Sequence, residues 1–346
     1  TPLYSSAASD VYKRQRLTLD AADNANAQQG IYAHDARRLN VHHVTIKNLV
    51  KSEAFGPHGI LFTGINPTRE KGVTDSVVAD CTLENIGLGA EFGGGIRLAW
   101  GSSRNRVLRN TIRNTGRGGI FGDNGSTHLI IQQNKVSGSG GTGLGIEVWG
   151  GCDRAVIEDN RIDHWLSIGG CDFCAARRNR ISDKSGDFKF AGLEVIGSYC
   201  IITDNVVDDG QHIGASVSGN VRKDYIFWGY NVIQNCIQWA AQLQGEEAGI
   251  ANHYFYRCKF RGTSVGRGDP AWPGHEGHGF RVNSNTRGLV LEECEFSENG
   301  GCGLQLFSGQ ADYLSFMRCL IKGNEGAAVA DLRDYNALEW LDCAVE

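Results

Sequence analysis

One asparagine position recurs along the chain at nearly regular intervals, and cysteine takes it over toward the C-terminus. Each occurrence ends the same phrase: a small residue, a short alternating apolar run, a polar corner and a second run rich in β-formers. Successive occurrences lie 19 to 36 residues apart. A period of this length is typical of a solenoid, in which each repeat packs on its neighbours. The positions are Asn48, Cys81, Asn110, Asn134, Asn160, Asn179, Asn205, Asn231, Cys258, Cys294, Cys319 and Cys343.

The apolar residues within each repeat favour strands over helices. They alternate with period two, and Gly or Asn ends every run. Few repeats contain the two-residue turns that hairpins need. We therefore predict an all-β coil of about 11 to 12 turns, with three short parallel strands in each turn. Like residues then stack, and the Asn or Cys side chains form an internal ladder.

The repeat also defines the domain organisation. Residues 1–15 fit no repeat, and their S-D-V-Y-K-R-Q portion resembles translated adapter sequence from metagenomic assemblies, so we predict a non-native leader there. Residues 16–346 form a single predicted domain without a linker. The last residues fall inside a repeat, so we expect that the chain is truncated at both ends.

The phrases that end at Asn110, Asn160 and Cys294 resemble those of the right-handed parallel β-helix proteins of the pectate-lyase-like superfamily. The resemblance covers about residues 30 to 346. It implies a right-handed parallel β-helix solenoid that binds an extended polysaccharide. Known members include glycoside hydrolases, polysaccharide lyases, epimerases and phage tailspikes. The resemblance thus implies a secreted, extracellular or virion-associated protein, as a monomer or a homotrimer.

Charge and cysteine content exclude some partners. The formal net charge is −5 with interspersed signs, whereas a nucleic-acid partner would require a basic stripe. No apolar run reaches the length of a membrane span. The eleven cysteines are expected to be buried free thiols, although stacking at about 4.8 Å leaves open a disulfide between Cys294 and Cys319 or between Cys319 and Cys343. Cys171 and Cys174 have metal or redox spacing, but no second pair completes a site.

The alternation predicts which side chains face out from one sheet of the coil. If Ile96, Ile120 and Ile146 face inward, their neighbours face solvent. Carboxylates, amides, arginines and aromatic rings on one face would suit an oligosaccharide. The predicted outward pairs are Arg97 with Ala99, Phe121 with Asp123, Glu147 with Trp149, Gly169 with Cys171, Glu194 with Ile196, Ser216 with Ser218, Gln242 with Gln244, Arg281 with Asn283 and Gln305 with Phe307.

Three carboxylates on this face are candidate catalytic groups. Glycoside hydrolysis uses two carboxyl groups, one as acid and one as base or nucleophile. Glu147 and Glu194 are the leading pair, two turns and about 9.6 Å apart, with Gly169 leaving a notch between them. Asp123 can replace either. The alternative is that these acids only form salt bridges. The predicted substrate-positioning residues are Trp149, Arg97, Gln242, Gln244 and Arg281, with Asp187 and Lys189 from a neighbouring loop.

Three activities remain open at this stage. A hydrolase is favoured, and it requires no cofactor or metal. A lyase or epimerase on uronates would need a base such as Lys189 or Arg97, often with calcium, yet no dense Asp cluster marks a calcium site. The third interpretation is a glycan-binding protein without catalysis. The insertion with His275, Glu276 and His278 is interpreted as a loop wall rather than a metal site.

Overall fold

The computed structural model describes residues 17–50, 56–140, 144–182, 189–208, 211–218, 223–244, 249–264, 277–308, 311–331 and 338–346. The chain winds through three sheets in turn, and every strand pairs in parallel with its counterpart one turn later. The predicted leader, residues 1–15, lies outside the described ranges. No helix that could cross a membrane is present in these ranges.

The sheets contain 13, 12 and 12 strands, in agreement with the predicted number of turns. The first sheet consists of β1 (Leu17–Asp20), β4 (Val44–Leu49), β7 (Thr82–Ile86), β10 (Thr111–Thr115), β13 (Lys135–Ser139), β16 (Arg161–Ile162), β19 (Arg180–Ser182), β22 (Val206–Asp208), β25 (Val232–Gln234), β28 (Lys259–Arg261), β31 (Glu295–Ser297), β34 (Leu320–Lys322) and β37 (Ala344–Val345).

The second sheet, which carries the candidate site, consists of β2 (Gln29–His34), β5 (His58–Thr63), β8 (Gly94–Leu98), β11 (Gly118–Asp123), β14 (Leu144–Trp149), β17 (Trp165–Gly169), β20 (Lys189–Ile196), β23 (Gln211–Val217), β26 (Trp239–Leu243), β29 (His278–Asn283), β32 (Leu304–Ser308) and β35 (Val329–Asp331).

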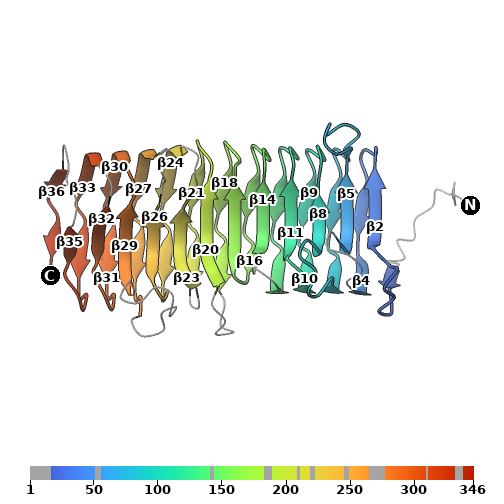
Figure 1. The fold of residues 1–346 in the computed structure, drawn as a ribbon, viewed down its shortest axis with the longest axis horizontal. Helices are drawn as coiled ribbons and strands as arrows, with labels where there is room; N and C mark the ends of the chain where they lie inside the picture. The colour runs from blue at the N-terminus through green and yellow to red at the C-terminus, as the bar shows by residue number, and fades with distance from the viewer. Residues whose placement is uncertain are drawn as a thin grey trace, which may run out of the picture.

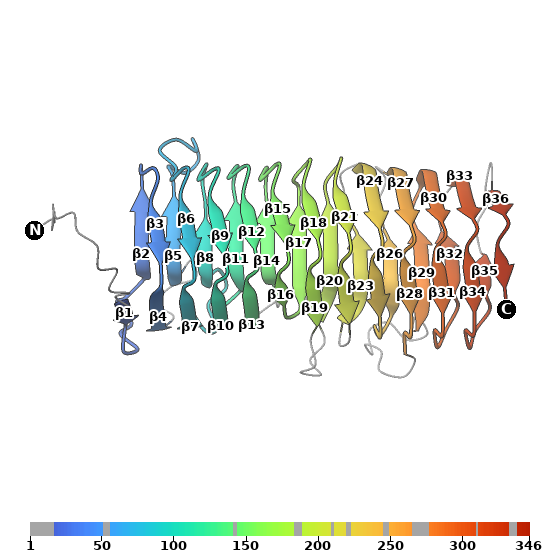
Figure 2. The ribbon, with the colours of Figure 1, turned by 180° about the vertical axis from the view of Figure 1, so that it is seen from behind.

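The third sheet consists of β3 (Asn40–His42), β6 (Val77–Ala79), β9 (Arg106–Leu108), β12 (Ile130–Gln132), β15 (Val156–Glu158), β18 (Ala175–Arg177), β21 (Ile201–Thr203), β24 (Lys223–Gly229), β27 (Ile250–Tyr256), β30 (Thr286–Glu292), β33 (Ala311–Met317) and β36 (Leu338–Leu341). The turns stack end to end, so that β2 and β36 lie near opposite ends of a long rod (Figure 1). The opposite view shows the third sheet along the same rod (Figure 2).

A two-residue corner joins most strands of the third sheet to the first, as Arg109 and Asn110 do between β9 and β10. At this corner Arg109, Gln133 and Asp159 adopt left-handed φ values of 54°, 57° and 57°. The next residue then points inward, and its amide side chain bonds to the turn above. Asn134 Oδ1, for example, accepts from the backbone N–H of Asn110 at 2.9 Å. Such a buried amide satisfies backbone groups that a sharp corner would otherwise leave without partners.

The predicted ladder is confirmed from Cys81 to Cys258. The backbone N–H of Cys81 donates to Asn110 Oδ1 at 3.0 Å, and the Asn231 amide ends the series by donating to Cys258 Sγ at 3.8 Å. All eleven cysteines are free thiols, and all except Cys302 and Cys343 are buried. Five of them, Cys81, Cys258, Cys294, Cys319 and Cys343, take ladder positions as small, weakly polar side chains.

The assignment of Asn48 to this ladder is wrong. Asn48 has a left-handed φ of 61°, and its Oδ1 accepts a hydrogen bond from Asn85 Nδ2. Both residues belong to a separate row of asparagines at the end of the first-sheet strands. Register pairs Thr45 with Thr82, so Val44 occupies the position equivalent to Cys81. Asparagine occurs at both corners of the repeat, and Asn48 lies four residues beyond the ladder position.

Candidate functional site

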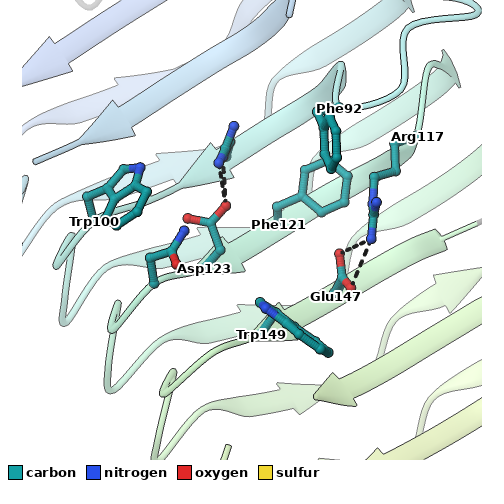
Figure 3. Close-up of a pocket in the computed structure, with 9 residues that line it drawn as sticks. Phe92, Trp100, Arg117, Phe121, Asp123, Glu147 and Trp149 are labelled. Carbon is teal, nitrogen blue, oxygen red and sulfur yellow. Dashed lines mark hydrogen bonds and ion pairs between the residues drawn. The ribbon is translucent and has the colours of Figure 1, made fainter. Parts of the chain in front are cut away.

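A pocket of about 440 Å³ lies on the outer face of the second sheet, over β8, β11 and β14. Figure 3 shows two carboxylates held by arginines between aromatic rings. Four of the predicted site residues converge here, namely Arg97, Asp123, Glu147 and Trp149. The full lining is Phe92, Arg97, Trp100, Arg117, Phe121, Asp123, Asn124, Glu147 and Trp149.

Glycines in neighbouring strands make room for the rings of the pocket. A Cβ at Gly94 would lie 2.6 Å from Phe121 Cε2, and one at Gly169 would lie 2.3 Å from Trp149 Cε3. Both distances are far below van der Waals contact, so only glycine lets these rings lie against the sheet. Trp149 still exposes 51% of its surface. A flat indole that is half exposed can stack on the apolar face of a sugar.

Asp123 is held by a close ion pair within the pocket. Arg97 Nε donates to Asp123 Oδ2 at 2.8 Å, and Nη2 lies 2.7 Å from the same oxygen. The Asp123 side chain exposes only 16% of its surface. Burial raises the pKa of Asp123 above its ordinary value, and the nearby Arg97 charge opposes this rise. Arg97 therefore stabilises the ionised form of a carboxyl group that desolvation disfavours.

Glu147 has a weaker partner. Arg117 Nη2 lies 3.4 Å from Oε1 and 3.5 Å from Oε2, while the Arg117 guanidinium also covers the Phe92 ring at 5.2 Å. Burial raises the pKa of Glu147, Arg117 opposes the rise, and the negative charges of Glu194 and Asp123 add to it. Burial thus favours the protonated form of Glu147, as it does for Asp123, but the Arg117 contact that opposes this is longer than the Arg97 contact to Asp123.

The register places Asp123 and Glu147 on a diagonal. Phe121 pairs with Glu147 and Asp123 pairs with Trp149. One strand spacing of ~4.8 Å and two residues of ~3.3 Å rise put the Cα atoms of the two acids roughly 8 Å apart. Side chains stand roughly perpendicular to a sheet, so both carboxyl groups enter the same pocket from adjacent turns.

Glu194 lies outside this pocket lining. Ser167 Oγ donates to Glu194 Oε2 at 2.8 Å, and Ser218 Oγ donates to Oε1 at 2.9 Å. Burial raises the pKa of Glu194, whereas the two serine hydrogen bonds and the Lys223 charge oppose the rise. Only 7% of Glu194 is exposed. Its carboxylate is thus held within the wall of the sheet.

The predicted notch between Glu147 and Glu194 is wrong. Ser167 pairs with both acids, whereas Gly169 pairs with Trp149 and Ile196. The register shifts by one residue between β14 and β17, in the repeat from Asn160 to Asn179 that is only 19 residues long. Cys171, two residues beyond the end of β17, is fully buried, so its predicted outward position is also wrong. The expected separation of two turns between the glutamates is nevertheless what the strand pairing gives.

Five other residues predicted to face solvent are buried. Ala99 is 1% exposed, and Ser216, Gln242, Arg281 and Gln305 each expose less than a tenth of their surface. The last four do lie in one register file of the second sheet. Side chains one strand spacing away cover them, as in any close-packed ladder.

The remaining predicted site residues are spread along the rod. Gln242 Nε2 donates to Gln244 Oε1, and Gln244 is exposed. Arg281 lies between the Trp239 and Phe307 rings. Asp187 falls outside the described residues, and of Lys189 only the backbone, at the start of β20, is described.

The candidate metal motifs give no metal site in the described part of the chain. No group of three or more His, Cys, Asp or Glu side chains there is placed to hold a metal ion. Cys171 Sγ instead accepts from the Cys152 backbone N–H at 3.2 Å. His278 Nδ1 accepts from the Cys302 backbone N–H at 2.9 Å, whereas His275 and Glu276 lie outside the described residues.

Sequence reasoning missed Phe92, Trp100 and Asn124 in the pocket wall. Phe92 precedes the glycine run that opens β8, and Trp100 and Asn124 follow the strand ends with left-handed φ values of 52° and 51°. Aromatic and amide residues at the ends of consecutive strands were the available signal, because equivalent turns of a solenoid lie side by side.

Comparisons with known proteins agree with this architecture. The model of the right-handed β-helix region matches residues 24–162 and 145–343. No curated protein matches the chain in sequence. The A-module of mannuronan C-5 epimerase AlgE4 from Azotobacter vinelandii has a similar structure, with a TM-score of 0.56, 11% identity and 89% coverage of each chain.

Two further solved structures share the fold. A double mutant of the periplasmic alginate epimerase AlgG gives a TM-score of 0.53 at 10% identity, covering 95% of this chain and 84% of that one. A mutant tailspike protein of E. coli bacteriophage HK620, in complex with a pentasaccharide, gives 0.58 at 10% identity, covering 87% and 60%. The family match, together with the three parallel sheets and the internal ladder, shows that this chain belongs to the right-handed β-helix family.

Proposed function

We propose that the protein binds an extended polysaccharide along the outer face of the second sheet and hydrolyses it in the pocket. One observation carries the proposal: two largely buried carboxyl groups, each with its own arginine, enter one aromatic pocket from adjacent turns. Solved proteins of similar fold include a mannuronan epimerase and a tailspike bound to a pentasaccharide, which supports a carbohydrate substrate.

The environments of the two acids assign them different roles. Burial raises the pKa of Glu147, its contact to Arg117 is long and two other negative charges lie near it, so we assign Glu147 as the general acid. The close Arg97 contacts oppose the rise that burial causes in the pKa of Asp123, so we assign Asp123 as the base. Glu147 gives its proton to the glycosidic oxygen as the C–O bond breaks. Asp123 takes a proton from the water that attacks the anomeric carbon.

The spacing favours an inverting reaction. Inverting enzymes hold their carboxyl groups about 6.5–9.5 Å apart, which leaves room for the water, whereas retaining enzymes hold them about 5–5.5 Å apart. If both side chains stand roughly perpendicular to the sheet, the carboxyl groups of Asp123 and Glu147 keep about the 8 Å separation of their Cα atoms, which fits the first arrangement. Glu194 has a supporting role in this scheme, since its charge raises the pKa of Glu147. No metal or other cofactor takes part.

The second sheet offers the substrate further contacts. Trp149 provides a stacking surface beside Glu147, and Gln242, Gln244 and Arg281 lie farther along the same sheet. With a polysaccharide substrate, the protein would act outside the cytoplasm or on a virion. A periplasmic epimerase and a phage tailspike are among the proteins of similar fold.

The test is a digest of a panel of neutral and acidic polysaccharides with wild type, Glu147→Gln, Asp123→Asn and Glu194→Gln. New reducing ends without ultraviolet-absorbing products indicate hydrolysis. We expect Glu147→Gln and Asp123→Asn each to reduce the rate by about 10²–10⁴-fold, and Glu194→Gln to reduce it less. Glu325→Gln, at an exposed site, is the matched control. Proton NMR of the first-formed anomer tests inversion.

Other outcomes of this digest would replace the proposal. Products with ultraviolet absorbance would indicate a lyase, for which a base other than Arg97 is needed, since both Arg97 contacts are committed to Asp123. Such a reaction could also depend on calcium. Binding of a glycan without any product would indicate an adhesive protein and would refute the catalytic roles.

A further inference from the structure

A second cluster on the same sheet is centred on a buried cation without a counter-ion. Arg281 in β29 exposes only 5% of its surface. Its guanidinium carbon lies 4.6 Å from the centroid of the Trp239 ring and 4.0 Å from that of Phe307. Among the described residues no carboxylate forms an ion pair with Arg281, and its Nε has no hydrogen-bond partner.

This arrangement is costly for the protein alone. Buried charges are ordinarily paired or bound to an ion, because removing a charge from water without a partner is unfavourable. Burial lowers the pKa of Arg281 to about 10, and no acidic neighbour opposes that shift. The two rings contribute cation–π attraction, but they satisfy none of the N–H groups of the guanidinium.

Polar atoms around Arg281 also lack hydrogen-bond partners that a polar ligand could supply. Gln242 and Gln305 pair with Arg281 from the two adjacent strands. The Oε1 atoms of both glutamines and the Nε1 atom of Trp239 are buried without hydrogen-bond partners. The cluster therefore offers two acceptors suited to hydroxyl groups beside the unpaired donors of the arginine.

The rings determine which anion fits. Trp239 and Phe307 cover the guanidinium, so a ligand must approach its N–H edge in the plane of the group. Arginine binds a carboxylate at this edge through two parallel N–H···O bonds. A carboxylate on a sugar ring would also bring the hydroxyl groups that the glutamine oxygens require.

We propose that Arg281, Gln242 and Gln305 form a subsite for the carboxylate of an acidic sugar, so that the polysaccharide is a uronate-containing polymer. This inference rests on the proposed function, because it uses the same face of the second sheet. Arg281 lies five strands from Glu147, through β17, β20, β23 and β26, which corresponds to about 24 Å. The substrate must then be several sugars long, with its negative charge bound far from the reacting bond.

The test measures binding separately from cleavage. Isothermal titration compares oligosaccharides of polygalacturonate and alginate with neutral dextran oligosaccharides, in the full chain carrying Glu147→Gln to prevent turnover. We expect Arg281→Gln to weaken binding of an acidic ligand by about tenfold or more. The affinity of any neutral ligand should not change. Arg180→Gln, which removes the same charge from an exposed site on the first sheet, is the matched control and should leave the acidic affinity unchanged.

A lysine variant and thermal unfolding separate recognition from packing. Arg281→Lys keeps the charge but loses the planar fork, so its affinity for the acidic ligand should fall between those of the parent and Arg281→Gln. Because Arg281→Gln removes an unpaired buried charge, its melting temperature should not fall. If Arg281→Gln lowers the melting temperature but leaves the affinity for the acidic oligosaccharide unchanged, Arg281 only stabilises the packing, and the proposed subsite is wrong.

Two further results would overturn the inference. One is equal affinity of the Glu147→Gln chain, with Arg281 in place, for acidic and neutral oligosaccharides, a measurement that does not depend on any Arg281 variant folding. The other is a loss of affinity in Arg281→Gln that occurs only with dextran sulfate as the ligand, because the subsite would then bind a sulfate group and not a carboxylate. If Arg281→Gln binds normally while Glu147→Gln abolishes product formation, the subsite fails and the proposed hydrolysis stands.

Discussion

Replacing Asn160 by alanine tests the internal ladder that supports the site. The Asn160 side chain is fully buried. Its Nδ2 donates to the Ile131 carbonyl oxygen at 2.9 Å and to Asn179 Oδ1 at 3.0 Å. Its Oδ1 accepts from the backbone N–H of Asn134 at 2.9 Å and from Asn134 Nδ2 at 3.0 Å. Asn160→Ala removes all of these bonds at once.

The expected cost follows from the partners that remain. Asn134 Nδ2 keeps the Val107 and Gln132 carbonyl oxygens as acceptors, whereas the buried backbone N–H of Asn134 is left without its ladder acceptor. An orphaned buried donor costs about 2 kcal/mol, and the other lost bonds contribute roughly 0.5–1 kcal/mol each. Asn160→Ala should therefore lower the free energy of unfolding by about 4 kcal/mol.

Urea denaturation followed by circular dichroism measures this change, with Asn26→Ala as control because Asn26 is exposed and its side chain makes no ladder bond. Amide hydrogen exchange should show faster exchange at Asn134 in the variant. A cost below about 1 kcal/mol, close to that of the control, would refute the idea that the buried amide ladder stabilises the coil.

Three further predictions concern the pocket. Gly169→Ala places a Cβ where the Trp149 ring lies, so it should displace the indole and weaken oligosaccharide binding by about 1–2 kcal/mol in titrations; unchanged affinity would exclude Trp149 as a platform. Burial raises the pKa of Glu147 above its ordinary value of 4.5, so ionised Glu147 costs stability above the unfolded pKa. Glu147→Gln should therefore raise the melting temperature at about pH 7 and lose this effect below about pH 4, and the same gain at both pH values would contradict the assignment. Hydrolysis should survive EDTA, since the proposed mechanism uses no metal, and loss of activity that calcium restores would favour a lyase.

Most of the fold could be predicted because a solenoid repeats one environment. Every ladder position lies about 4.8 Å from its copy and faces the same backbone corner, so the same small amide or thiol recurs and the period shows in the sequence. The prediction for Asn48 was wrong because asparagine also adopts the left-handed conformation at the opposite corner, where Asn48 lies.

The candidate site was predictable only in outline. Alternation put Arg97, Asp123, Glu147 and Trp149 on one face, and the structure brings them into one pocket. It could not place Ser167 beside Glu147, because the repeat there is the shortest and the register between β14 and β17 is irregular, so the spacing of the other repeats does not apply. The turn residues of the pocket wall do not repeat, so no period marks them.

The amino-acid sequence by itself determined that this chain coils, how many turns it makes and which face carries its polar groups, because those properties follow from local alternation and a fixed repeat. Only the tertiary structure decided which acid has which partner. The arginine of Asp123 lies 26 residues away, that of Glu147 lies 30 residues away, and the Ser167 hydroxyl that holds Glu194 lies 27 residues away. The protonation of a carboxyl group depends on its desolvation and on the charges beside it, and adjacent turns supply both.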